Sequence, residues 1–576
     1  MVTLIRRFPA VFLLTLGLGV PALAYAAVKV TVKGVGGDLA RNVSAYVGKP
    51  ARQDPVSLRV FRKSVPGAAR RAMEALGYYH ATVRVEETRE KTVTHFVVNV
   101  KPGPPVHVSK VELRIQGPAA DDPAFKKLRD RLPIKPGGVL NQGEYEAAKR
   151  AITSTAALRG YFEGRFTVHR IAVNTRTNLA AIDLTYVSGP RYRLGHVHFQ
   201  KSPLSEKLLQ RFVPFKPGAA YSADDIAKLN KNLLDSQYFS NVGVEASPDR
   251  AQDHVIPVDV SLVPSPRNTI AAGVGFATDV GPRVNLNWTR PYVNSRGHSI
   301  SVQTQLSAVN QNLTGTYSIP LSNPLTDSLQ FKLGWQRQDV QDTLSEQYTA
   351  TIQHQRLLPS KWTRTEFVQW QQERFQQGDQ RGRTDLYMPG VSFARTRARG
   401  GVDPYWGDRL SLSVEGADTA LASDISLFRV QASAKWLRTF WTRSRIYLRS
   451  DLGAIETNSF DQVPPSLRFF AGGDQSVRGF AYQSISPTDA SGQAVGGRYL
   501  MVGSVEYDYQ FLPKWRVATF VDAGKVFNKV FTPFSVGTGF GLRWISPVGP
   551  VRLDLAFAVS EPGAPWRIHF SMGPEL

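Results

Sequence analysis

The sequence predicts an exported protein in which a tandem array of small α+β units precedes an all-β, 16-stranded antiparallel transmembrane barrel. Three observations predict this fold class: an N-terminal export signal, an internal repeat of roughly 80 residues, and alternation of apolar and polar residues through the second half. The chain has 576 residues, of which 42% are hydrophobic. This length and composition are enough for several packed cores.

Composition excludes several classes of function. The chain has no cysteine, so disulfides, thiol catalysis and Cys-ligated metals are excluded, and passage through an oxidising compartment is safe. The formal charge is +23, but the basic residues are spread along the chain without a compact run or an RNA-binding motif. We therefore expect no nucleic-acid partner; anionic lipids or acidic clients are alternatives for such a charge.

Residues 1–26 resemble a secretory signal peptide. Arg6 and Arg7 precede an apolar stretch that is too short to span a bilayer, and small residues follow it. We expect cleavage between Ala26 and Ala27; a buried N-terminal helix is the alternative. After residue 26 no run of 18 apolar residues occurs. The mature chain is therefore either soluble or inserted as a closed barrel, the other fold that satisfies backbone polar groups in lipid.

The first half contains three copies of one pattern. In each copy an aromatic pair ends a helical stretch and an alternating strand follows it. We predict units at residues 27–103, 104–190 and 191–265, each ordered strand, helix, helix, strand, strand; three unrelated α+β domains are the alternative. The junctions are Gly77-Tyr78-Tyr79, Gly160-Tyr161-Phe162 and Gln237-Tyr238-Phe239.

Residues 266–576 show the pattern of a transmembrane barrel. In the last strand Trp566, Ile568 and Phe570 face one way, while Arg567 and His569 face the other. A wet lumen tolerates such inward charges, whereas a soluble β-sandwich, the alternative, would expose them to bulk water. At roughly 19–20 residues per strand and connection, this region holds about 16 strands.

Two features interrupt the regular alternation. Gly537, Gly539 and Gly541 share one face of a strand, which weakens it unless a second backbone must approach closely. If that face is the lumen, the stripe makes room for an inserted segment; a curvature device is the alternative. The candidate segment is the long connection at residues 456–498, which we predict to be a lid loop.

Several motifs in these regions are similar to those of a known superfamily. Val477-Arg478-Gly479-Phe480 resembles the lid-loop motif of the barrel assembly and two-partner secretion proteins, and Phe520-Val521-Asp522-Ala523-Gly524 resembles one of their strand motifs. Members of that superfamily carry periplasmic POTRA domains before a 16-stranded barrel. The resemblance therefore identifies the three repeated units as POTRA domains 1 to 3.

Within the superfamily the sequence is most similar to the TamA subfamily, named for the translocation and assembly module. The resemblance implies a protein of the outer membrane of a Gram-negative-type cell, with its N-terminal domains in the periplasm. It implies unfolded outer-membrane protein clients, outer-membrane lipid and a TamB-like, inner-membrane-anchored, periplasm-spanning partner. The subfamily marks are Asp279–Arg283, Arg399-Gly400-Gly401, Trp406-Gly407-Asp408 and Met572–Leu576.

Arg478 is the central residue of the predicted lid site. If its loop folds into the lumen, the guanidinium needs carboxylate or carbonyl partners. The resemblance selects Asp522, and the other inward acids are Glu506, Asp508 and Asp554. The residues alone leave a second reading open, in which the motif is an extracellular hairpin tip with a solvated arginine.

The second predicted site is the seam between the first and last barrel strands. Gly273 and Gly275 lie on one face of the first strand, and Ile568, Phe570 and Gly573 lie on or at the end of the last. Weak pairing would leave the first strand as an exposed edge that can template a client strand. The alternative is that these glycines only relieve curvature.

The sequence thus predicts an assembly factor for autotransporter-type and other barrel clients. A two-partner secretion exporter of a single large protein is the alternative, and a passive porin or a barrel enzyme is a third hypothesis. No H-E-x-x-H, G-x-S-x-G or phosphate-binding loop occurs, so we expect no catalytic residues, no enzyme activity, no cofactor and no metal.

Overall fold

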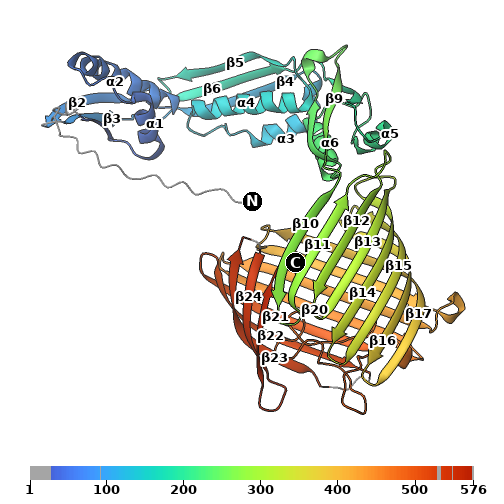
Figure 1. The fold of residues 1–576 in the computed structure, drawn as a ribbon. Helices are drawn as coiled ribbons and strands as arrows, with labels where there is room; N and C mark the ends of the chain where they lie inside the picture. Colours follow the sequence, from blue (N-terminus) through green and yellow to red (C-terminus); the bar gives the residue numbers. More distant parts are fainter. Residues whose placement is uncertain (1–26, 91–92, 529–532, 548, 574–576) are drawn as a thin grey trace, which may run out of the picture. The chain divides into compact units, whose positions relative to one another are not determined.

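The computed structural model describes residues 27–90, 93–528, 533–547 and 549–573 (Figure 1). The expected signal peptide lies outside the described residues, and Ala27 opens the first strand. Within the described part of the chain, no helix has both the length and the apolar character needed to cross a membrane.

Each of the three N-terminal units has the predicted order of strand, helix, helix, strand, strand. Its third strand lies at the centre of a three-stranded sheet, as in β1-β3-β2 and β4-β6-β5, and in those two sheets the first strand joins the third in parallel. The elements are β1 (Ala27–Lys33), α1 (Gly37–Val47), α2 (Pro55–Ala75), β2 (Thr82–Glu90), β3 (Val93–Lys101), β4 (His107–Gln116), α3 (Pro123–Arg131), α4 (Gln142–Arg159), β5 (Arg165–Asn174), β6 (Leu179–Val187), β7 (Arg193–Phe199), α5 (Glu206–Leu209), α6 (Ala223–Asp235), β8 (Phe239–Glu245) and β9 (Val255–Pro264).

Helix ends and packing in the second unit explain the repeated sequence pattern. The Asn141 side chain accepts hydrogen bonds from the backbone N–H groups of Gly143 and Glu144, which caps the start of α4. Gly160 ends that helix in a left-handed conformation, with φ +83°. The turn places Tyr161 in the core against Phe125. The glycine–aromatic junction is therefore a helix stop followed by a core anchor.

The described C-terminal region forms a closed barrel of sixteen strands, in which neighbours in sequence pair antiparallel (Figure 1). We call the end where the first strand begins the proximal end, and the opposite end the distal end. The strands are β10 (Thr269–Ala277), β11 (Gly281–Arg290), β12 (Ser299–Ser307), β13 (Asn310–Pro320), β14 (Asp327–Val340), β15 (Thr343–Leu357), β16 (Thr363–Gln377), β17 (Gln380–Arg399), β18 (Trp406–Ala417), β19 (Leu427–Phe440), β20 (Ser444–Thr457), β21 (Tyr499–Leu512), β22 (Trp515–Phe527), β23 (Ser535–Ser546), β24 (Gly549–Ala558) and β25 (Trp566–Met572).

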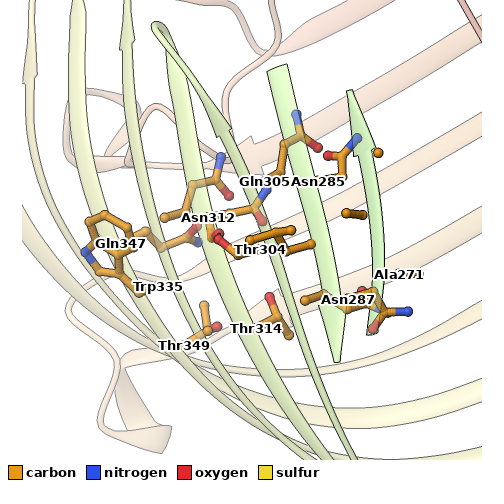
Figure 2. A pocket seen from close by; sticks show the side chains of 16 residues that line it. Ala271, Asn285, Asn287, Thr304, Gln305, Asn312, Thr314, Trp335, Gln347 and Thr349 are labelled. Atoms are coloured by element: carbon orange, nitrogen blue, oxygen red, sulfur yellow. The ribbon is translucent and has the colours of Figure 1, made fainter. Parts of the chain in front are cut away.

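The two faces of the barrel wall differ in polarity. Outward side chains such as Val274, Leu333 and Phe428 remain exposed, with Val274 79% exposed. Such a belt is unfavourable in water and suits a hydrocarbon environment. The lumen face of β10 to β15 is instead lined mainly by amides and hydroxyls around a hollow of about 640 Å³, shown in Figure 2.

Candidate functional site

The connection between β20 and β21, residues 458–498, folds into the barrel and packs against its wall. Two short bridges, between Phe469 and Gly497 and between Ala471 and Ile485, fold the loop on itself. Apolar side chains from the loop and from four strands form one buried cluster, so the loop is a packed part of the lumen. The cluster contains Ile455, Phe469, Ala471, Val477, Phe480, Leu500, Val502, Val526 and Ala558.

Arg478 projects from this lid loop into a pocket of carboxylates and is 5% exposed. Its Nε donates to Asp522 Oδ2 at 2.8 Å and its Nη2 donates to Asp522 Oδ1 at 3.0 Å, which makes a bidentate pair. Its Nη1 donates to Glu506 at 2.6 Å and to Asp554 at 3.2 Å. The guanidinium also lies 3.4 Å from the centroid of the Phe520 ring. The loop is therefore fixed to β21, β22 and β24 at once.

A second arginine completes the charge cluster. Arg543 of β23 is fully buried, donates to Glu506 at 3.0 Å and pairs with Asp554. Glu506 and Asp554 thus each bridge two guanidinium groups. Because buried charges are tolerated only when they are paired and hydrogen-bonded, the acids of the wall and the lid arginine depend on one another.

The glycine stripe of β23 makes room for the lid. A Cβ atom at Gly537 would overlap the carbonyl oxygen of Arg478, and one at Gly541 would overlap the Asp554 carboxylate. At Gly539 a Cβ would meet the backbone of β24 and the Phe520 ring. The stripe therefore faces the lumen and allows the loop backbone and the charge cluster to approach this strand.

The seam between β10 and β25 is the weakest junction of the described barrel. Their ladder has a single registered pair, Ala277 with Ser571, whereas β10 and β11 share nine. A Cβ at Gly273 would meet open space, and Gly573 has a φ of +143°. On β25, Ile568 is exposed and Phe570 packs against Phe276 with ring centroids 5.7 Å apart. Among the residues that the structure describes, the stretch of β10 before Ala277 therefore has no ladder partner on its seam side.

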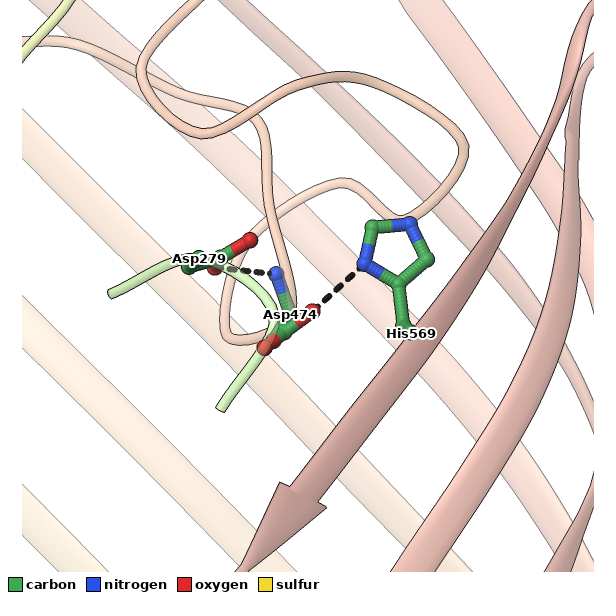
Figure 3. A group of neighbouring side chains, drawn as sticks. All are labelled: Asp279, Asp474 and His569. Atoms are coloured by element: carbon green, nitrogen blue, oxygen red, sulfur yellow. Dashed lines mark hydrogen bonds and ion pairs between the residues drawn. The ribbon is translucent and has the colours of Figure 1, made fainter. Parts of the chain in front are cut away.

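The lid loop is tied to both sides of this seam, as Figure 3 shows. The backbone N–H of Asp474 donates to Asp279 Oδ2 at 2.6 Å, in the turn that follows β10. The Asp474 carboxylate lies 2.5 Å from His569 Nδ1 on β25 and accepts from Thr278 Oγ1 at 2.9 Å. His569 Nε2 accepts the backbone N–H of Gly479 at 2.9 Å. One loop residue, Asp474, thus contacts both seam partners.

Among the described residues, Asp279, Asp474 and His569 form a group that could hold a metal ion. Their ligand atoms lie within 4.8 Å of one another. Both ring nitrogens of His569 are already engaged in hydrogen bonds, so the geometry favours a hydrogen-bonded tie over a metal centre. Burial, with a contribution from the Asp474 carboxylate, raises the pKa of Asp279 to about 7.

Comparison with known families matches nearly the whole described chain. The Omp85 superfamily domain matches residues 268–575, the model for POTRA domain TamA domain 1 matches residues 29–102, and a POTRA model described as surface antigen variable number repeat matches residues 123–187 and 192–264. The chain belongs to the Omp85 superfamily. Three POTRA units followed by a closed 16-stranded barrel, the predicted fold class, are confirmed.

Several Omp85 relatives are similar over part of their length. The outer membrane protein assembly factor BamA of Nitratidesulfovibrio vulgaris is 23% identical over 433 residues, covering 70% of this chain and 54% of the relative. A putative outer membrane protein assembly factor of Treponema pallidum is 24% identical over 223 residues, covering 36% of this chain and 26% of the relative. The chain thus spans about half of the first of these relatives and about a quarter of the second.

One solved structure supports the fold. BamA from Haemophilus ducreyi lacking POTRA domains 1–3 has a TM-score of 0.69 and 16% identity, over 81% of this chain and 99% of that chain. At this identity the similarity shows the common fold of a POTRA-bearing barrel.

The structure brings together most residues of the predicted lid site. Arg478 meets Asp522, Glu506 and Asp554, while Asp508, the fourth acid considered, pairs with Arg445 instead. Sequence reasoning missed Arg543, although its place in the strand after the glycine-rich run marks it as inward. It also missed the tie through Asp474 and His569, whose positions in sequence give no sign of contact.

Removal of the lid arginine should release the loop. We expect Arg478→Ala to leave three wall carboxylates short of a cation, which typically costs about 3–5 kcal/mol when a buried pair is broken. The measurement is the rate of chymotrypsin cleavage after Phe480 and Tyr482, which should rise. Arg409→Ala, which removes an exposed arginine of β18, is the matched control and should change nothing. Equal cleavage in both variants would show that the charge cluster does not hold the lid.

The pKa of Asp279 predicts a pH-dependent stability. The folded pKa is about 7, whereas an unfolded Asp titrates near pH ~3.9. Between these values the unfolded chain has lost the proton that the folded protein keeps, so the wild-type unfolding free energy falls as pH rises and then stays constant above about pH 7.

Asp279→Asn keeps an acceptor for the Asp474 N–H but cannot ionise. Its stability advantage over the wild type should grow from pH ~4 to pH ~7, measured by urea unfolding in detergent followed by tryptophan fluorescence. Asp379→Asn, at an exposed acid in another distal turn, serves as the control. A difference between Asp279→Asn and wild type that is independent of pH would contradict the assignment.

Proposed function

We propose that this protein is an outer-membrane assembly factor of the TamA type, which helps insert or secrete autotransporter-type and other β-barrel clients. The observation that carries the proposal is the short seam ladder, in which β10 before Ala277 has no partner among the described residues. Family membership supports a role in assembly or secretion, and the first N-terminal unit matches the model of a TamA POTRA domain. The client class is part of the proposal.

In this proposal the seam edge of β10 is the template for a client strand. Backbone N–H and C=O groups without a ladder partner pair readily with an incoming extended segment. In lipid the drive to pair is stronger, because water is not present to satisfy them. Ala271 and Gly273 of this strand line the hollow of neutral amides and hydroxyls shown in Figure 2. A client strand that adds here therefore meets the hydrogen-bonding groups of a hollow whose lining holds no charged side chain.

In this proposal the lid stays packed in the lumen while β10 exchanges β25 for a client strand at the seam. Its charge cluster lies on β21 to β24, so addition of a strand at β10 leaves those contacts in place. The tie through Asp474 must loosen when β10 and β25 part, because it contacts both sides. The mechanism has no chemical step and requires no ATP, and we propose that the protein is not an enzyme.

The proposed orientation places the proximal end and the POTRA units in the periplasm. There the units would receive unfolded outer-membrane clients by edge-strand addition. A TamB-like protein anchored in the inner membrane and spanning the periplasm is the proposed partner. This assignment rests on the TamA-type match of residues 29–102 and not on a contact in the structure.

A disulfide across the seam tests the template directly. Ala277 and Ser571 are registered partners, and the chain has no native cysteine, so Ala277→Cys with Ser571→Cys gives one defined crosslink. Under oxidation we expect outer-membrane levels of autotransporter-type clients to fall to those of a deletion strain, and reductant should restore them. The measurement is quantitative immunoblotting of the clients in outer-membrane fractions.

The matched control crosslinks strands that stay paired. Asn285→Cys with Gln305→Cys joins registered partners on β11 and β12 and should leave client levels unchanged. Client levels that survive the seam crosslink would refute templating at β10 and would favour the alternative, an exporter that passes a single large partner protein through its lumen.

A further inference from the structure

Four arginines gather on the outer face of the barrel wall at the proximal end. We call them the arginine patch: Arg395, Arg397 and Arg399 at the end of β17, and Arg438 near the end of β19. The β17 arginines face outward because that strand alternates, with Leu386 and Met388 buried on the lumen side and Tyr387 exposed on the other. Arg438 faces outward with the exposed Phe428 of β19, while Leu437 is buried on the lumen side. Arg395, Arg397 and Arg399 each follow Tyr387 by an even number of residues, so they lie on the same outward face of the strand.

Carboxylates balance only part of this charge. Asp408 of β18 accepts from Arg397 at 2.6 Å and from Arg395 at 3.2 Å, and lies 3.9 Å from Arg438. Arg399 forms no ion pair with any residue that the structure describes, and the buried Nε of Arg395 has no hydrogen-bond partner there. One acid against four arginines leaves an excess of positive charge with unused donors.

Tryptophan rings hold these guanidinium groups in place. Trp406 lies under Arg397, Arg399 and Arg438, with guanidinium-to-centroid distances of 5.4, 5.0 and 4.4 Å. Trp362 similarly lies 4.9 Å from the guanidinium of Arg395. Stacking fixes the planar groups. Because their side chains are already ordered, less conformational entropy is lost when a ligand binds.

The turn behind the patch is fixed as well. Residues 400–405 join β17 to β18, and Gly400 and Gly401 adopt positive φ values of +113° and +64°. Asp403 of this turn forms a two-pronged pair with Arg516 of β22, with both distances 2.7 Å. The turn is thereby anchored to a distant strand. This anchoring positions Arg399 and Trp406, the residues that flank the turn.

The surroundings indicate a membrane interface. Phe440, the last residue of β19, is 41% exposed, and the next residue, Trp441, is 89% exposed. Tryptophan is enriched where a barrel wall meets lipid headgroups. Guanidinium groups at that level match phosphate in charge and in bidentate geometry.

We propose that the arginine patch binds the phosphate of an anionic phospholipid, a phosphatidylglycerol or a cardiolipin, in the leaflet at the proximal end. The choice of leaflet rests on the proposed function, which turns this end to the periplasm, where the outer-membrane leaflet consists of phospholipid. Basic pockets on a membrane-facing wall bind such headgroups.

The position of the patch gives the bound lipid a role. β17 and β18 are the eighth and ninth of the sixteen strands, so the patch lies halfway around the barrel from the seam. A lipid held there anchors the wall that does not move while the seam exchanges strands.

The test compares lipid binding by the purified full-length protein and a charge-matched pair of variants. Arg395→Gln, Arg399→Gln and Arg438→Gln together remove the patch, yet they leave Arg397 on the buried Asp408 carboxylate, so the wall keeps its ion pair. Arg59→Gln, Arg70→Gln and Arg71→Gln on α2 make the same charge change at exposed positions outside the barrel. Heat-modifiable migration in gels confirms that each barrel is folded.

Native mass spectrometry with phosphatidylglycerol and with phosphatidylcholine of the same chains measures the binding. Each arginine near an anionic surface contributes about fivefold. We therefore expect the wild type and the α2 variant to prefer phosphatidylglycerol, and the patch variant to bind it at least about tenfold more weakly.

Equal binding of the two lipids by the wild type, or an unchanged preference in the patch variant, would overturn the proposal. Loss of client assembly without any lipid preference would instead assign the patch to an acidic protein partner and would overturn it too. The binding measurement requires no client. If the wild type proved to have no role in client assembly but still preferred phosphatidylglycerol, and the patch variant lost that preference, the proposed function would be refuted and the lipid site would stand.

Discussion

The burial of one guanidinium inside the barrel constrains the C-terminal half of this protein. An isolated charge in such a position is strongly unfavourable, and a pair is tolerated only when its remaining donors and acceptors are also satisfied. Arg478 meets this condition through Asp522, Glu506 and Asp554, and Arg543 supplies the second cation that two of these acids need. The inward acids, the glycine stripe and the path of the lid loop all follow from accommodating this group.

The same loop connects that rigid cluster to the weakest junction of the described barrel. Neighbouring residues of the loop make the contacts with the two regions. Asp474 contacts the seam, Arg478 contacts the wall acids, and Gly479 contacts His569 of β25. A movement of β25 away from β10 therefore acts on the loop within five residues of its main anchor. The seam and the lid are coupled through short covalent distance, which a solvated hairpin tip could not provide.

Local pattern in the sequence predicts the elements of this fold well, because alternation, glycine stops and aromatic anchors are set by neighbouring residues. The inward direction of Glu506, Asp522 and Asp554 follows from that alternation alone. The choice of Asp522 as the partner of Arg478 came from a family resemblance, since the residues themselves allowed a solvated arginine. The contact of Asp474 with His569 spans 95 residues, and the number of ladder pairs at the seam depends on strand tilt and closure. Neither the contact nor the number of ladder pairs can be predicted from a local pattern in the sequence.

The barrel wall is asymmetric about its seam, and the asymmetry fits strand exchange. On the side of β10, the lumen is lined by neutral groups such as Asn285, Asn287 and Gln305. These groups can exchange hydrogen bonds with water for hydrogen bonds with the wall or a client at a small net cost in free energy. On the side of β25, the lumen is filled by the lid and by fixed charges that cannot be separated without a large penalty. A client strand that entered from the β25 side would have to disturb those charges, whereas one that adds to β10 loosens the tie through Asp474 and leaves the Arg478 cluster in place. The seam edge of β10 therefore lies on the flank where the proposed addition of a strand is least opposed.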